Sequence, residues 1–176
     1  SEENILYIGT SNKEMYRIEN ANTGDPKMIK LDTVSKRLPT GGYISGIAVD
    51  PDSAKNVLVC VSNYGVMSLF YSFDYGNTFY YVGGNLEFGS QNPTGGDPSI
   101  RCVNILVNNQ GKRIYFAGTS IGLFSTDSLV LAIGSNLSLN KTKWVQEGAD
   151  KIGAAVVTSI KVRRIDGYVA VGTHGN

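Results

Sequence analysis

The sequence predicts an all-β protein built from repeated four-stranded antiparallel units. Glycine accounts for 21 of the 176 residues and charged residues for 18% of the chain, against about 7% and about 25% in average soluble domains. Many glycines and few charges suit short strands joined by tight turns. No segment keeps a period of 3.6 residues over ten or more positions, so no helix is predicted.

One strand pattern returns four times along the chain. Similar apolar strands are predicted at 6–11, 57–62, 115–120 and 169–174. Aligning Gly9, Val61, Gly118 and Gly172 gives intervals of 52, 57 and 54 residues. Repeats of about 40 to 50 residues are typical of four-stranded propeller blades, so each interval predicts one blade.

Each unit is predicted to hold up to four strands, a to d in chain order, of which the repeated strand is b. Strand a is expected at 44–49, 100–107 and 157–162, strand c at 14–20, 68–74 and 122–127, and strand d at 27–31, 78–82 and 143–146. Turn-forming residues separate a from b, as in the Asp-Pro-Asp-Ser run at 50–53. The order is therefore b-c-d, then a-b-c-d twice, then a-b.

This order gives 13 strands in units at about 1–40, 41–96, 97–152 and 153–176. Strand b of the second unit is apolar on both faces, so it needs a covering layer on each side, and neighbouring blades would supply both layers. Propellers have about four to eight complete blades. We therefore expect an incomplete, open segment of a larger propeller, whose partners are the remaining blades of the same protein or another chain.

A turn motif follows the second c strand, where residues 72–79 read SFDYGNTF. Asp74 is expected to accept hydrogen bonds from turn amides, Gly76 to take a positive φ, and Phe79 to re-enter the layer between sheets. The pattern S-x-D-x-G-x-T-F resembles the Asp-box of the bacterial neuraminidase repeat, the BNR repeat. The resemblance implies a structural role, away from the ligand face of a propeller, for Ser72, Asp74, Gly76, Thr78 and Phe79.

The third unit carries a degenerate version of this motif. It has no glycine, and a 13-residue insertion at 129–141 splits it. We assign Ser125, Asp127, Thr142 and Trp144 to this degenerate Asp-box. N-glycosylation sequons begin at Asn136 and Asn140 in the same loop.

The C-terminal part of the chain has a second resemblance. Segments 144–148 and 159–176, the latter ending in Gly-Thr-His-Gly-Asn, resemble the last blade of secreted propeller proteins that are exported by type IX secretion. That resemblance implies a bacterial protein that is secreted or displayed on the cell surface.

Composition argues against several classes of function. A net charge of +1 without a basic cluster disfavours a nucleic-acid groove. No apolar run of eighteen residues exists, so membrane insertion by a helix is not predicted. His174 is the only histidine, and Cys60 and Cys102 form no CxxC motif. We therefore expect buried thiols, no metal site and no cofactor.

Short segments of the chain also resemble two families of enzymes, which gives an alternative to a non-catalytic role. Tyr16-Arg17-Ile18 resembles the sialidase segment Tyr-Arg-Ile-Pro, whose arginine clamps a substrate carboxylate, but Glu19 replaces the proline. The run at 47–51 followed by the box resembles xyloglucanase-type glycoside hydrolases, which use paired carboxylates. The carboxylates available are Asp50, Asp52 and Asp97, of which the first two also suit a tight turn.

The leading interpretation is a non-catalytic scaffold or a segment that binds a glycan or a protein. The alternative is a fragment of a propeller glycoside hydrolase, xyloglucanase-like or sialidase-like, that acts on polysaccharide.

Overall fold

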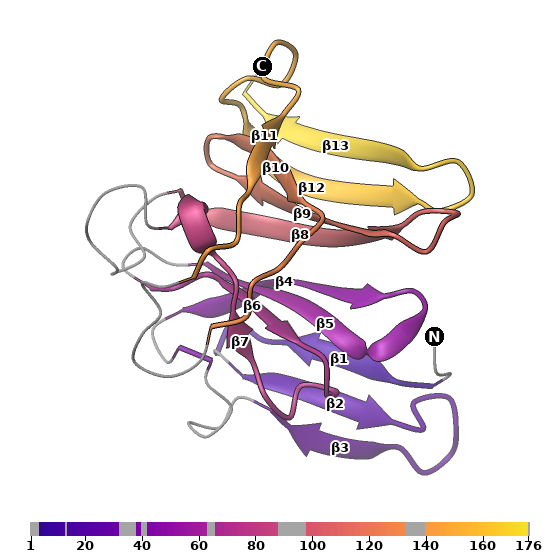
Figure 1. The fold of residues 1–176 in the computed structure, drawn as a ribbon. Helices are drawn as coiled ribbons and strands as arrows, with labels where there is room; N and C mark the ends of the chain where they lie inside the picture. The colour runs from indigo at the N-terminus through magenta and orange to yellow at the C-terminus, as the bar shows by residue number, and fades with distance from the viewer. Residues whose placement is uncertain are drawn as a thin grey trace.

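The computed structural model describes residues 4–12, 14–31, 38–39, 42–62, 66–87, 98–132 and 140–175. These residues form four antiparallel sheets that follow one another along the chain (Figure 1). Helical structure within the described ranges is confined to one 3-10 turn, η2 (Gly84–Leu86). The predicted all-β class is confirmed.

Each sheet is a meander in which strands adjacent in sequence are adjacent in space. The first sheet has β1 (Leu6–Gly9), β2 (Met15–Glu19) and β3 (Lys27–Lys30). The second has β4 (Tyr43–Asp50), β5 (Ser53–Ser62), β6 (Leu69–Ser72) and β7 (Tyr80–Tyr81). The third has β8 (Ile100–Val107), β9 (Arg113–Thr119), β10 (Gly122–Thr126) and β11 (Val145–Glu147), and the fourth has β12 (Val156–Arg163) and β13 (Tyr168–His174). The predicted strand order is confirmed, with shorter c and d strands than expected.

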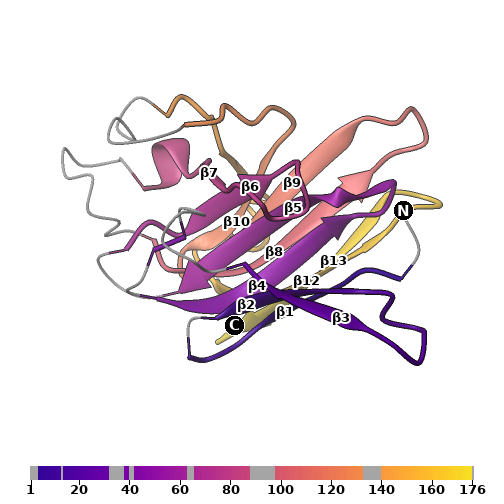
Figure 2. The same cartoon turned by 90° about the horizontal axis from the view of Figure 1, so that it is seen from below.

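The sheets pack against one another in chain order. β1 contacts β4, β4 and β5 contact β8, and β8 and β9 contact β12, and Figures 1 and 2 show each sheet beside the next. A separate hydrophobic cluster fills each of the three interfaces. β5 is buried on both faces as predicted, because Val57 and Val59 belong to the cluster with the first sheet and Leu58 to the cluster with the third.

A bulge at one position recurs in the inner strand of three sheets. The pairing skips a residue after Ile44 in β4, after Ile100 in β8 and after Val157 in β12. The residues opposite the end of each bulge are Cys60, Gly118 and Gly172. Cys60, and not Val61, is therefore equivalent to the two glycines, and the predicted alignment was wrong by one residue in the second unit.

Close approach of neighbouring strands explains the residue type at this position. A Cβ at Gly9 would lie 2.3 Å from an atom of Ile44, and one at Gly118 would lie 2.4 Å from the Cys102 sulfur. The second sheet tolerates Cys60 because its partner across the bulge is Gly46, where a Cβ would lie 2.8 Å from the Cys60 sulfur.

Gly118→Ala is expected to lower the free energy of unfolding by about 1 to 3 kcal/mol, because the added methyl group overpacks the interface with β12. Gly24→Ala is the matched control, since no atom lies within 4 Å of its ideal Cβ, and it should change stability by less than about 0.5 kcal/mol. Urea unfolding of both variants measures the difference. Equal stabilities would contradict the steric explanation.

Candidate functional site

The turn at residues 72–79, which carries the motif that resembles an Asp-box, joins β6 to β7 at the end of the second sheet. The Ser72 hydroxyl donates to Asp74 Oδ1 at 2.8 Å and accepts from the Gly76 amide at 2.8 Å. Asp74 Oδ1 also accepts from the Thr78 amide at 2.8 Å. Gly76 has a φ of 77°, and Phe79 is 1% exposed in the cluster with the first sheet. The hydrogen bonding, positive φ and burial expected from the sequence are all present.

The turn also contacts the first sheet. Arg17 of β2 donates from Nη1 to the Tyr75 carbonyl at 2.6 Å, and its guanidinium lies 5.5 Å from the centre of the Tyr75 ring. Arg17 also forms an ion pair with Glu19 at 2.7 Å and is 7% exposed. The guanidinium suggested as a sialidase-like clamp is thus buried and bonded within the protein.

Strand register places the Ser and Asp positions of the degenerate motif one residue later than predicted. Because Leu123 pairs with Gly118 as Leu69 pairs with Cys60, Thr126 is equivalent to Ser72 and Ser128 to Asp74. The Ser128 amide donates to the Thr126 hydroxyl at 3.3 Å, as the Asp74 amide does to Ser72.

Three of the four residues predicted for the degenerate motif have other contacts. Ser125 donates to Glu147, Asp127 forms an exposed ion pair with Lys112, and Thr142 bonds to Val130. The fourth residue, Trp144, is equivalent to Phe79 as predicted, because Gln146 pairs with Phe124 as Tyr81 pairs with Phe70. Trp144 is buried in the cluster with the second sheet, as Phe79 is in the cluster with the first, and its indole nitrogen donates to the Val82 carbonyl at 2.9 Å.

Two of the three candidate catalytic carboxylates link the second sheet to a later one, Asp50 to the third sheet and Asp52 to the fourth. Asp50 is ion-paired with Arg113 of β9, and Asp52 is ion-paired with Arg164, after β12, at 2.5 Å. Burial alone would raise the pKa of the Asp50 carboxyl, but hydrogen bonds from Arg113, the Asp52 amide and Asn56 together hold it below its ordinary value. A general acid for glycoside hydrolysis needs a raised pKa, so Asp50 does not suit that role. Asp97 lies outside the described residues.

Sequence reasoning missed one titratable group, Glu87. Its side chain follows η2, is 4% exposed, and accepts a hydrogen bond from the Ser68 amide at 2.5 Å. Burial raises the pKa of Glu87 to about 7, and the Tyr81 hydroxyl lies beside the carboxyl. No local sequence pattern marks this glutamate, because the groups that bury it come from β6 and β7. The carboxyl is too enclosed for a substrate to reach.

The two cysteines and the histidine that the sequence analysis considered show no sign of a reactive site in the described structure. Burial raises the pKa of Cys60 to about 12 and of Cys102 to about 11, and both are free thiols. His174 is exposed at the end of β13. Among the described residues, no group of three or more His, Cys, Asp or Glu side chains could hold a metal ion.

The structure describes one of the two N-glycosylation sequons. Asn140 is 8% exposed, and its amide donates to the Tyr81 carbonyl at 2.9 Å, so this sequon is closed to glycosylation in the folded chain. The sequon at Asn136 lies outside the described residues.

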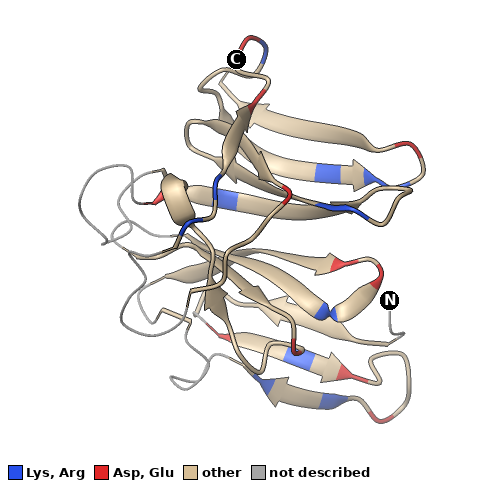
Figure 3. Ribbon diagram, in the orientation of Figure 1, with Lys and Arg blue, Asp and Glu red and all other residues tan. Residues whose placement is uncertain are grey.

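Figure 3 shows acidic and basic residues interspersed over the four sheets. Within the part of the chain that is described, no helix has the length and apolar character needed to cross a membrane.

A hollow of about 660 Å³ lies between the third sheet and β13. Its walls come from β9, β10, β11 and β13, and they include Phe116, Leu123 and Val171. Such a surface suits an apolar or polypeptide ligand better than a charged small molecule.

No protein-family model matches this chain, and no curated protein is significantly similar to it. The resemblance to Asp-box propellers therefore depends on the residues quoted above.

Replacing Asp74 with alanine is expected to lower the free energy of unfolding by about 1 to 3 kcal/mol, because the Thr78 amide and the Ser72 hydroxyl lose their acceptor. Thermal melts of the variant and the wild type measure this loss. Asp25→Ala, at an exposed turn position, is the control and should stay within about 0.5 kcal/mol of wild type. A melt unchanged by Asp74→Ala would contradict a structural role for the box.

Proposed function

We propose that the chain is a non-catalytic scaffold or ligand-binding segment of a larger β-propeller, in which each sheet forms all or part of one blade. The observation that carries this proposal is the strand inventory: two four-stranded sheets of equivalent register lie between a three-stranded and a two-stranded sheet. Open sheets at both ends leave space for further blades, from the same protein or another chain, since propellers have about four to eight complete blades.

The box turn supports the non-catalytic part of the proposal. Ser72 and Asp74 direct their polar atoms at the turn itself, and the Arg17 contact joins that turn to the first sheet. These groups stabilise the packing of one sheet on the next and offer no free acid, base or nucleophile. The ligand class that we propose is a glycan or a protein, and the C-terminal resemblance supports a secreted or cell-surface location.

The alternative is a fragment of a propeller glycoside hydrolase. The resemblance of residues 47–51 and of the box to xyloglucanases favours it. Against it stand the lowered pKa and the ion pair of Asp50, the ion pair of Asp52, and the burial of Arg17. We therefore prefer the non-catalytic function.

Hydrolysis assays separate the two functions. The purified chain is incubated with xyloglucan and with a fluorogenic sialoside, and product is compared with a buffer blank and with the Asp50→Asn and Asp52→Asn variants. We expect no product above the blank from any of the three proteins. Hydrolysis by the wild type that either variant abolishes without a change in its thermal melt would overturn the proposal.

A further inference from the structure

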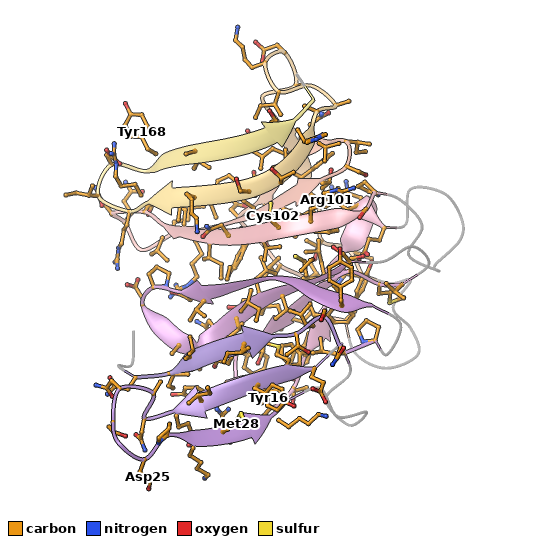
Figure 4. The ribbon with its side chains drawn as sticks, turned by 180° about the vertical axis from the view of Figure 1, so that it is seen from behind. Tyr16, Asp25, Met28, Arg101, Cys102 and Tyr168 are labelled. Atoms are coloured by element: carbon orange, nitrogen blue, oxygen red, sulfur yellow. The ribbon has the colours of Figure 1, made fainter. Side chains whose placement is uncertain are left out.

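The fourth sheet ends at a free edge beside the hollow. β13 pairs with β12 on one side, and within the described residues it has no partner strand on the other. In the second and third sheets the equivalent strands β5 and β9 pair on that side with β6 and β10. The hollow therefore lies against the position that a third strand would occupy. Tyr168, at the start of β13, points away from the body of the protein (Figure 4) and is 67% exposed.

Strand register identifies which residue of such a strand would enter the hollow. Because Gly172 is equivalent to Gly118 and Cys60, Val171 is equivalent to Ala117 and Val59. The residues opposite Ala117 and Val59 are Phe124 and Phe70, respectively.

Both phenylalanines face the preceding sheet. Phe70 is 4% exposed in the cluster between the first and second sheets, and Phe124 packs against the cluster between the second and third. Val169 and Val171 likewise face the preceding sheet, in the cluster with Phe116 and Leu123. A residue opposite Val171 would therefore project into the hollow.

We propose that the β13 edge and the hollow together form an acceptor site for an extended polypeptide strand, which pairs antiparallel to β13 and inserts an aromatic side chain opposite Val171. This inference rests on the proposed function, in that it treats the fourth sheet as built like the second and third. Backbone hydrogen bonds along an exposed strand edge supply affinity in such complexes, and a side-chain pocket supplies specificity.

The lining of the hollow favours a peptide over a sugar. Its floor is apolar, with Ile114, Phe116, Leu123 and Val171. The polar groups at its rim are largely engaged, since Lys112 is ion-paired with Asp127 and Glu147 accepts from Ser125. An apolar floor beside an unpaired backbone edge matches a strand with apolar side chains at alternate positions.

Peptide binding tests the acceptor site. The probe is a fluorescently labelled peptide with the sequence of residues 119–128, which contains the third strand of the third sheet, and its anisotropy is followed as the protein is added. We expect saturable binding, weakened at least tenfold when the phenylalanine of the peptide, at the position of Phe124, is replaced by aspartate.

Two protein variants locate the site on β13. Val171→Arg places a charge in the hollow and should weaken binding at least tenfold. Ala170→Arg is the matched control, because Ala170 is exposed and adjacent in sequence but faces away from the third sheet, and it should bind like the wild type. Thermal melts check that both variants fold. If Val171→Arg does not fold, the aspartate peptide decides the test.

Three results would overturn the inference. These are no peptide binding, equal binding of the phenylalanine and aspartate peptides, and light scattering that shows a dimer dissociated by Val171→Arg, which would assign the hollow to a second copy. The hydrolysis assay is independent of these outcomes. Hydrolysis would overturn the proposed function and leave strand binding intact, whereas absent peptide binding would overturn only the acceptor site.

Discussion

Glu87→Gln is expected to abolish a fall in stability of about 3 kcal/mol that the wild type undergoes between about pH 4.5 and pH 7. Burial raises the pKa of Glu87 from 4.5 to about 7. In this pH range the unfolded chain releases the Glu87 proton while the folded chain keeps it. The free energy of unfolding therefore falls as the pH rises, by about 1.4 kcal/mol for each pKa unit of difference.

The sign of this effect follows from the raised pKa. The contribution of protonated Glu87 is fully present below about pH 4.5 and is lost as the pH rises through about 7. Glutamine cannot ionise, and its carbonyl can still accept from the Ser68 amide that bonds to Glu87.

Urea unfolding of both proteins at pH 5 and pH 8 measures the difference. Because all other titrating groups are common to the two proteins, the variant serves as the control for the wild type. Equal pH dependence in the two proteins would show that the carboxyl is not buried as described.

Asp50→Ala is expected to lower the free energy of unfolding by about 3 kcal/mol at pH 7, since removing the buried carboxylate leaves the Asp52 amide and Asn56 without their acceptor and takes the ion-pair partner from Arg113, which is itself 34% exposed. The Asp50 side chain is 1% exposed and accepts from Arg113, from the Asp52 amide at 2.8 Å and from Asn56 at 3.2 Å. The lowered pKa gives this contribution the opposite pH dependence to Glu87. It is present above the ordinary pKa of about 3.8 and is lost as the pH falls through the lower folded value.

Asp52→Ala is the matched control for this prediction. Asp52 lies two residues away and also forms an ion pair, but its side chain and that of Arg164 are 34% and 50% exposed. Solvent screens such a pair, so the expected loss is below about 1 kcal/mol. Urea unfolding at pH 7 compares the two variants. A loss for Asp52→Ala as large as that for Asp50→Ala would contradict the assignment of the ion pairs by burial.

Local pattern was sufficient for the strands and for the intact box. Alternation of apolar residues and the turn residues between them located all 13 strands in the correct order, because both depend on neighbours in sequence. The hydrogen bonds of Ser72 and Asp74 were predictable for the same reason, since donor and acceptor lie within six residues of each other.

Errors arose where register depends on contact between strands. Val61 was aligned in place of Cys60, and only the pairing of β5, β9 and β13 with the bulged strands β4, β8 and β12 shows which residues are equivalent. A separate one-residue error assigned Ser125 and Asp127, in place of Thr126 and Ser128, to the degenerate motif, because the pairing of β10 with β9 is needed to place them.

The amino-acid sequence by itself determined the all-β class, the strand order and the chemistry of the box turn, because these follow from interactions between near neighbours. Only the tertiary structure decided the burial of Glu87 and the pairing of Asp50 with Arg113. It also decided that the edge of β13 lies beside an apolar hollow. Those features join residues far apart in sequence, so their desolvation and charge partners exist only after the sheets pack.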